Sequence, residues 1–210
     1  METLHHLNIF THVAIGTAAL VTGLIAIFTW KRKKYHTRFG RYFMWAMIPV
    51  ITTALLGVLV FKRHSFLLII TLLSGYTCFS GIRAIRLKGK APRPLDYGAT
   101  ISVMTLAICY GSTAGMYWAP AVTFSTIGAL FLVTTYDLAK GLFSTPFLRK
   151  AAVYEHVYKM TSSLSGLASA FAGTVFPQYK PYSQLLPSML GLAGIIIIFI
   201  QLRKWQHIRL

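Results

Sequence analysis

The sequence predicts an all-α membrane protein, built as a single bundle of seven transmembrane helices that occupies residues 1–210. Of the 210 residues, 55% are hydrophobic and only 12% are charged, and the mean hydropathy is +0.60. A soluble domain carries about 25% charged residues, so this chain has about half the charge needed to cover a surface that faces water. At about 20 residues per membrane-spanning helix, seven helices leave roughly 70 residues for all loops and tails. No separate soluble domain fits.

The first three expected helices are apolar runs that end at charged segments. Leu7–Trp30 stops where the basic segment from Lys31 begins, and Phe39–Phe61 follows that segment. Ser65–Ile85 stops at a second basic segment that includes Arg86. Each run is long enough to cross a hydrocarbon core of roughly 30 Å. The N-terminus lacks the basic start and cleavage site of a secretory signal, so we expect the first run to remain as a span.

The last four expected helices are Asp96–Trp118, Pro120–Leu142, Ala151–Phe176 and Leu185–Leu202. The break between the first two of these is short, and we expect a tight turn just before Pro120, because one unbroken helix would far exceed the bilayer. All seven runs are continuous rather than alternating in polarity, which excludes a transmembrane β-barrel.

The basic residues predict the orientation of the helices, because basic loops stay on the cytoplasmic side. Counting along alternate connections places 17 of the 21 Lys and Arg residues on one side, in the first, third and fifth connections and the C-terminal tail. The N-terminus is therefore expected outside and the C-terminus in the cytoplasm, in the cytoplasmic (inner) membrane. The basic residues behind the net charge of +17 then orient the helices in the membrane and attract anionic lipid headgroups. The Lys and Arg residues punctuate apolar runs, which argues against nucleic-acid binding.

The polar residues at the inner ends of the spans are the candidate functional groups, because charge in hydrocarbon costs at least about 2.5 kcal/mol. Five helix ends bring His36, Arg41, Arg83, Asp137 and His156 to one layer near the inner interface. Whether these side chains converge laterally is left open by the sequence.

Asp137 is interpreted as the one carboxylate well inside a span. It is expected either to form a structural ion pair with Arg41, Arg83 or Arg149, or to lie beside His156, where a carboxylate would fix the imidazole tautomer. Lys159, inside the sixth span, is a further group for a proton or an ion pair.

Helical spacing predicts which faces of two spans point inward. His156, Lys159, Ser163, Gly166, Ala170 and Gly173 recur at steps of three and four and form one stripe of small and polar residues. Tyr76, Ser80 and Arg83 form a similar line in the third span. His12 lies on a stripe with small residues in the first span, and two interpretations stay open for it: a hydrogen bond between helices, or a metal or haem ligand.

Several segments resemble a known family. They are His12–Gly23, Tyr35–Tyr42 with its His-x-x-x-Gly-Arg-Tyr pattern, Gly81–Ala84, Asp137, Glu155–Met160, Ala168–Ala172 and Leu186–Gly191. Over nearly the whole chain they resemble the domain of unknown function 2306 family of bacterial integral membrane proteins. The resemblance implies a compact helical bundle with His12, His36, Arg41, Asp137 and His156 as functional positions, and it supplies no reaction.

The first functional hypothesis is a membrane redox protein that transfers electrons through haem b. His12, His36 and His156 are the candidate ligands, and His36 with His156 is the best pair on the inner side. Tyr76, Arg41 and Arg83 are then available to haem propionates or to a quinone.

Two alternatives remain. In the first, the chain is a proton-coupled transporter or binder of a small anionic or lipidic molecule, with Asp137 and His156 carrying the proton and Arg83 holding the anion. In the second, His36, Asp137 and His156 bind a metal ion in a membrane hydrolase, where two histidines and one carboxylate leave a position for water. Whether the chain is an enzyme, and its oligomeric state, are left open.

Overall fold

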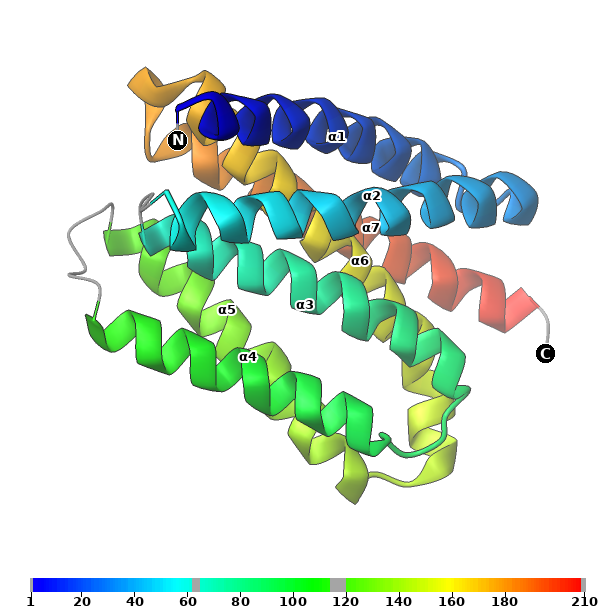
Figure 1. Cartoon of the computed structure of the whole chain (residues 1–210). Helices are drawn as coiled ribbons and strands as arrows, with labels where there is room; N and C mark the ends of the chain where they lie inside the picture. Colours follow the sequence, from blue (N-terminus) through cyan, green and yellow to red (C-terminus); the bar gives the residue numbers. More distant parts are fainter. Residues whose placement is uncertain (1, 62–64, 114–119, 209–210) are drawn as a thin grey trace.

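The computed structural model of the chain is an all-helical bundle (Figure 1) and describes residues 2–61, 65–113 and 120–208. Seven α-helices and two short 3-10 turns make up this part of the chain, and it contains no strand. In order they are α1 (Glu2–Phe28), α2 (Lys33–Leu59), α3 (Ser65–Leu87), α4 (Pro94–Thr113), α5 (Pro120–Ala139), η1 (Lys140–Leu142), α6 (Thr145–Val175), η2 (Pro177–Tyr179) and α7 (Tyr182–Ile208).

Each expected apolar run overlaps one helix, and several of these helices begin before the run does. Helix α2 starts at Lys33 and α6 starts at Thr145, because the polar segments ahead of the two runs are themselves helical. Glu155 and His156 therefore lie in the third turn of α6 rather than in its first turns. The turn expected before Pro120 lies outside the described residues.

Five helices are long and apolar enough to cross a membrane: α1, α2, most of α3, most of α5 with η1, and most of α7. Helix α4 has a shorter apolar segment, Pro94–Cys109, within the described residues. Helix α6 is long enough, at 31 residues, but it carries Arg149, Lys150, Glu155 and Lys159 and is not among the five. Its charges therefore need an explanation from the packing.

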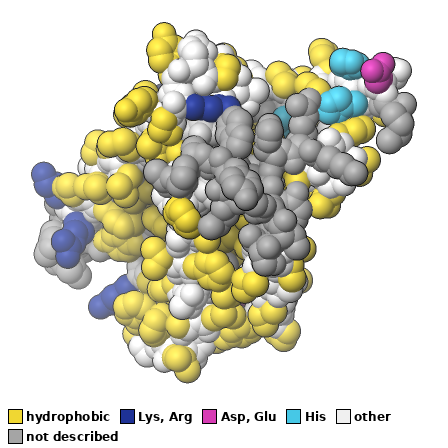
Figure 2. Space-filling view, turned by 90° about the vertical axis from the view of Figure 1, so that its left-hand side faces the viewer, with side chains coloured by type: hydrophobic (Ala, Val, Ile, Leu, Met, Phe, Trp, Pro, Cys, Tyr) yellow, Lys and Arg dark blue, Asp and Glu magenta, His cyan; other side chains and the backbone are white. Residues whose placement is uncertain are grey.

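The distribution of polar and apolar side chains is that of a membrane-embedded protein. Large apolar side chains such as Phe10, Phe28, Leu132 and Leu142 are exposed on the surface of the bundle, and hydrophobic groups cover much of the face in Figure 2. The interior, in contrast, contains many Thr and Ser side chains and four ionisable ones. Apolar groups outside and hydrogen-bonded polar groups inside suit a hydrocarbon environment.

Helices α3 and α6 form the centre of the bundle. They pack along each other, α1 and α2 form a hairpin against one side, α7 packs on α6, and α4 and α5 pack on α3. The chain termini lie at opposite ends of the bundle (Figure 1). The α1–α2, α3–α4 and α5–α6 connections lie at the same end as the C-terminus, and most of the basic residues lie in these connections or in the helix ends that flank them.

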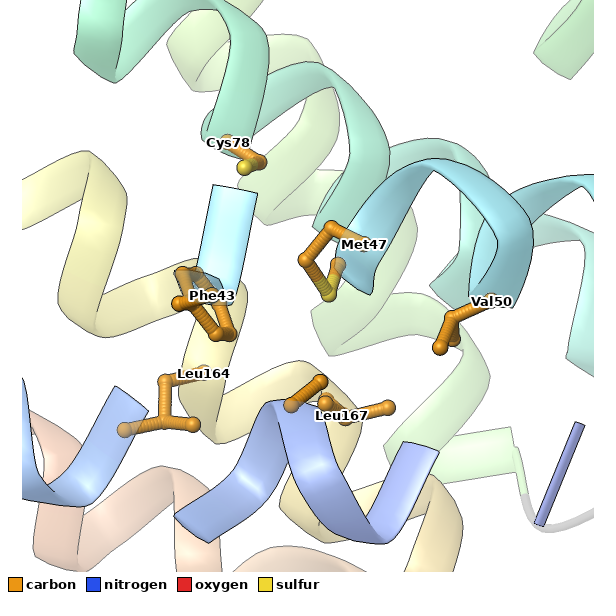
Figure 3. Close-up of a cluster of buried hydrophobic side chains, with 7 residues drawn as sticks. Phe43, Met47, Val50, Cys78, Leu164 and Leu167 are labelled. Atoms are coloured by element: carbon orange, nitrogen blue, oxygen red, sulfur yellow. The ribbon is translucent and has the colours of Figure 1, made fainter. Parts of the chain in front are cut away.

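An apolar cluster joins α1, α2, α3 and α6. Phe43, Met47 and Val50 of α2 meet Leu164 and Leu167 of α6 in Figure 3, and Ala19 of α1 and Cys78 of α3 complete the cluster.

Small residues allow the central helices to approach closely. A Cβ built on Gly81 would lie 3.0 Å from the Cβ of Lys159, and a Cβ on Gly166 would overlap the hydroxyl of Ser74. Ser163 donates a hydrogen bond to the carbonyl of Ser74 at 2.8 Å. The predicted inward stripe of α6 is confirmed, since Lys159, Ser163, Gly166 and Gly173 are buried. So is the inward line of α3, where Tyr76 and Ser80 are buried.

Replacing Gly89 by Ala is expected to destabilise the protein. Gly89 has φ +82°, and a Cβ there would lie 2.7 Å from the Cα of Arg149 at the start of α6. The left-handed conformation alone costs a residue with a side chain about 1–2 kcal/mol. Thermal unfolding in detergent should show a clearly lower midpoint for Gly89→Ala.

The matched control is Gly98→Ala in α4, where a new Cβ meets no atom within 4 Å. Alanine is the better helix former by up to about 1 kcal/mol, so this variant should unfold at the wild-type temperature or above it. Equal midpoints for the two variants would contradict the close approach at Gly89.

Candidate functional site

The interior holds four ionisable side chains in mutual contact, which we call the ion-pair cluster: Asp137, Lys140, Glu155 and Lys159. Asp137 lies in the last turn of α5 and Lys140 opens η1, while Glu155 and Lys159 lie one turn apart on α6. The spacings of three and four residues place each pair on one side of its helix. The contact between α5 and α6 then brings the two pairs together.

The distances define a network that crosses from α5 and η1 to α6. Lys159 Nζ donates to Asp137 Oδ1 at 2.5 Å and lies 3.4 Å from Glu155 Oε2. Lys140 Nζ donates to Glu155 Oε2 at 2.7 Å and lies 3.7 Å from Asp137 Oδ1. Each lysine therefore contacts both carboxylates, and the formal charges of the cluster sum to zero.

Two tyrosines occupy the remaining carboxylate oxygens. Tyr76 of α3 donates its hydroxyl hydrogen to Asp137 Oδ2 at 2.6 Å, and Tyr136 of α5 donates to Glu155 Oε1 at 2.7 Å. The hydroxyl of Tyr76 also hydrogen-bonds with Thr100 Oγ1 of α4 at 2.7 Å. All four oxygens of the two carboxylates are thus engaged, which is what charges need when they are removed from water.

The cluster is deeply buried. Lys159 is 1% exposed, and Asp137 and Glu155 are 7% and 8% exposed. An isolated charge at such a place is unfavourable, whereas a neutral, fully hydrogen-bonded set offsets much of the loss of hydration. The charges of α6 are therefore compatible with a helix inside the membrane, because the end of α5 and η1 supply their counter-ions.

A second ion pair lies close by, between Arg83 at the end of α3 and Asp96 at the start of α4. Arg83 Nε donates to Asp96 Oδ1 at 2.5 Å and Nη2 donates to Oδ2 at 2.8 Å, a bidentate geometry. Arg83 and Asp96 line a small cavity of about 20 Å³ together with Tyr76, Asp137 and Lys140. This ion pair therefore borders the cluster on its α3–α4 side.

The opposite side of the cluster faces a larger cavity of about 280 Å³. We call it the lateral cleft; it is lined by Leu132, Val133 and Tyr136 of α5, Ala151, Tyr154, Glu155, Tyr158 and Lys159 of α6, and Phe199 of α7. Helix α7 packs on α6, and α5 packs on α3 and α4, but α5 and α7 do not pack extensively against each other. The cleft lies between α5 and α7, and α6 forms its floor.

The structure corrects the expectations for Asp137. Its expected partners Arg41, Arg83 and Arg149 are wrong, because Lys159 and Lys140 bind it instead. Nor is it the one carboxylate well inside a helix, since Glu155 is buried to the same extent.

Lys140, which follows α5 in the fifth connection, is buried in the cluster. One further expectation at the cluster is wrong. His156 does not bind Asp137; its Nδ1 donates to the carbonyl oxygen of Gly81 at 2.9 Å.

His36 and His156 do come together, beside the cluster rather than within it. Their ring centroids are 6.2 Å apart and the rings are nearly perpendicular. His36 Nδ1 lies 2.9 Å from the carbonyl oxygen of Ala26, just as His156 Nδ1 contacts Gly81. A carbonyl oxygen only accepts, so both rings carry hydrogen on Nδ1 and, when neutral, present the lone pair of Nε2.

His12 and Arg41 lie apart from both groups. His12 Nδ1 bonds to Thr53 Oγ1 of α2 at 2.9 Å, and the threonine donates its own hydrogen to the backbone of α2, so His12 is the donor. Of the two interpretations of His12, the structure displays the hydrogen bond between helices. Arg41 lines an open cavity at the start of α2 with Lys33, Lys34 and Arg38. The residues expected in one inner layer therefore form separate groups rather than one shared cavity.

The structure does not bring His36, Asp137 and His156 together as a set of metal ligands. Across residues 2–61, 65–113 and 120–208, no group of three or more His, Cys, Asp or Glu side chains is placed to hold a metal ion. The two histidines alone remain as a pair.

Four members of the site were not singled out from the sequence: Lys140, Glu155, Tyr136 and Asp96. The spacing Asp137–Lys140 (i, i+3) and Glu155–Lys159 (i, i+4) is a recognisable signal of ion pairs within a helix. Nothing in the sequence indicates that the two pairs share one site, since the helices that carry them could have faced different neighbours.

Comparison with known proteins adds no further constraint. No family model matches the chain, and no curated protein and no solved structure matches it. The resemblance to the domain of unknown function 2306 family stays a prediction from the segments quoted above.

Removing one charge of the cluster should cost more than removing two of opposite sign. We expect Lys159→Met to lower the free energy of unfolding by about 3–5 kcal/mol, because it leaves two buried carboxylates with one lysine. Adding Asp137→Asn restores charge balance and should recover part of the loss. Thermal or denaturant unfolding in detergent of the two single variants and the double variant measures this non-additivity.

Lys150→Met is the control, because Lys150 is exposed on the same helix and its removal should change stability by no more than about 0.5 kcal/mol. Simple additivity of Lys159→Met and Asp137→Asn would mean that the two side chains do not interact.

Proposed function

We propose that the chain is a protein of the cytoplasmic membrane that binds a small lipidic or anionic molecule at the ion-pair cluster and moves a proton together with it. The observation that carries the proposal is the cluster itself, buried between α5 and α6 and bordered by a cavity of about 280 Å³ that reaches Glu155 and Lys159. Ionisable groups inside a membrane bundle mark substrate and proton paths, because their presence there is costly.

Charge balance supports the link between the ligand and the proton. The cluster has no net charge. A proton on either carboxylate therefore leaves one uncompensated positive charge. The anionic group of a ligand beside the lysines leaves one uncompensated negative charge. When both bind, the balance is restored. Each therefore favours the other, and by linkage the effect is reciprocal.

The proposal includes an orientation. With seven spans, the N-terminus outside and the C-terminus in the cytoplasm, the cluster lies towards the cytoplasmic side. The basic connections at one end of the bundle support this orientation, since such connections stay in the cytoplasm. They would also face the anionic headgroups of the inner leaflet.

Proton movement that depends on Asp137 is the first test. Proteoliposomes made from a total lipid extract of bacterial membranes are loaded with a pH-sensitive dye, clamped at zero voltage and exposed to an acid step. Wild-type protein should accelerate internal acidification severalfold over empty liposomes, and Asp137→Asn should abolish the acceleration. Tyr76→Phe, which removes only the hydroxyl that binds Asp137, should reduce it.

Glu2→Gln is the matched control, since it removes an exposed carboxylate at the start of α1 and should leave the rate unchanged. Each variant is first checked for thermal stability. If stable Asp137→Asn protein acidifies the liposomes as fast as the wild type, the cluster does not carry the proton.

The histidine pair supports a second candidate function, membrane electron transfer with haem b. His36 of α2 and His156 of α6 come from different helices and lie with their ring centroids 6.2 Å apart, so they are the residues that would hold the haem iron. The hydrogen bonds from both Nδ1 atoms to backbone carbonyls are typical of ligating histidines. Haem would supply one-electron chemistry there.

An absorption spectrum tests this candidate. Protein purified from haem-supplied cells should show a Soret band after reduction, and either His36→Ala or His156→Ala should remove it. His12→Ala, which alters a histidine outside the pair, should keep the band. Wild-type protein without a Soret band would remove haem from consideration.

A further inference from the structure

The lateral cleft has two chemically different parts. Tyr136, Tyr154, Tyr158 and Phe199 provide aromatic walls, and Tyr154 and Phe199 contact each other edge to face with centroids 5.0 Å apart. The inner part consists of Glu155 and Lys159, which belong to the ion-pair cluster. An aromatic slot that ends at buried charges fits a flat ring with a polar substituent.

The mouth of the cleft faces the surroundings of the bundle rather than its ends. Leu132, at the rim, is 73% exposed, and Ile196 and Ile200 on the neighbouring face of α7 are also exposed. These are side chains of the apolar outer surface described above. A molecule that enters between α5 and α7 therefore arrives from the lipid, which selects for one that is uncharged and lipid-soluble when it enters.

The polar end has unused hydrogen-bonding capacity. Lys159 has three hydrogens, and the two acceptors within its reach are Asp137 and, at the longer distance of 3.4 Å, Glu155. Glu155 Oε1 accepts one hydrogen bond, from Tyr136, and a carboxylate oxygen has room for a second. A ligand hydroxyl could donate to Glu155 and accept from Lys159 at the same time.

From these features we infer that the lateral cleft binds a lipid-soluble weak acid of the phenol class, with its ring between the aromatic walls and its hydroxyl facing Glu155 and Lys159. This inference rests on the proposed function and names the ligand class for the same site. The proton balance is simple: the phenol O–H bond breaks, the proton passes to Glu155, and the phenolate oxygen is held by Lys159. The site has no net charge before or after the transfer.

The volume agrees with a ligand of this size. Small-molecule sites in proteins begin at about 300 Å³, and the cleft, at about 280 Å³, has room for a small fused ring but not for a long tail. Any alkyl substituent would lie outside, along the apolar surface near Leu132.

The test uses 2-naphthol as the probe and 2-methoxynaphthalene as its matched control, since the methyl ether has the same ring and no acidic hydrogen. Binding to wild-type protein in phosphatidylcholine nanodiscs is measured by equilibrium dialysis, with empty nanodiscs subtracted. We expect 2-naphthol to bind at least about tenfold more tightly than the ether, because the ether leaves charged groups without their hydrogen bond.

Two tryptophan variants locate the site. Leu132→Trp places a bulky ring at the mouth of the cleft and should weaken 2-naphthol binding about tenfold, because the ring occupies the path of the ligand. Leu106→Trp adds the same side chain to an exposed position of α4 that does not line the cleft, and it should bind like the wild type. Both positions are on the outer surface, so the fold should tolerate both changes.

The outcomes separate the inference from the function it rests on. Equal binding by the two tryptophan variants would overturn the cleft as the site, and equal binding of 2-naphthol and its ether would overturn the weak-acid class. Either result could coexist with proton movement that depends on Asp137, in which case the proposed function would stand with another ligand. Loss of that proton movement with 2-naphthol binding intact would leave a binding site without transport.

Discussion

The balance of charge inside the bundle is the constraint on which the rest of the structure depends. Helix α6 packs along α3 at the centre, yet it carries Glu155 and Lys159 into an interior where an unpaired ion costs several kcal/mol. Asp137 and Lys140 supply one charge of each sign across a helix interface. Helix α5 packs on α3 and α4 partly through an apolar cluster that includes Leu130, and the ion pairs with the hydroxyls of Tyr76 and Tyr136 link it to α6.

Close packing of the central helices gives this network its geometry. Gly81 lets α3 come near the Cβ of Lys159, and the carbonyl of Gly81 also receives the hydrogen bond from His156. One glycine thus helps to set the position of two functional side chains on the inward stripe of α6. Lys159 belongs to the ion-pair cluster, and His156 belongs to the histidine pair.

The sequence predicted the helices well and the contacts between them poorly. Apolar length is a local property, so each expected span contains a helix, and the inward faces of α3 and α6 followed from their spacing. That Asp137 and Lys159 lie at one level of the bundle was also predictable. Their partnership was not, because the lateral order of helices depends on contacts between segments far apart in the chain. For the same reason Arg83 was one of three partners expected for Asp137, although Asp96, just across the α3–α4 connection, binds it.

The neutral cluster has a consequence for biosynthesis. A single Lys or Asp at the centre of a membrane helix opposes insertion by about 2.5–3.5 kcal/mol, and α6 carries two such ions on one face. Its counter-ions stand at the end of α5 and in η1, and only a short connection separates them from α6. In the proposed seven-span arrangement, α5 and α6 would therefore enter the bilayer most favourably as a preformed hairpin, because α6 alone would carry unpaired charges.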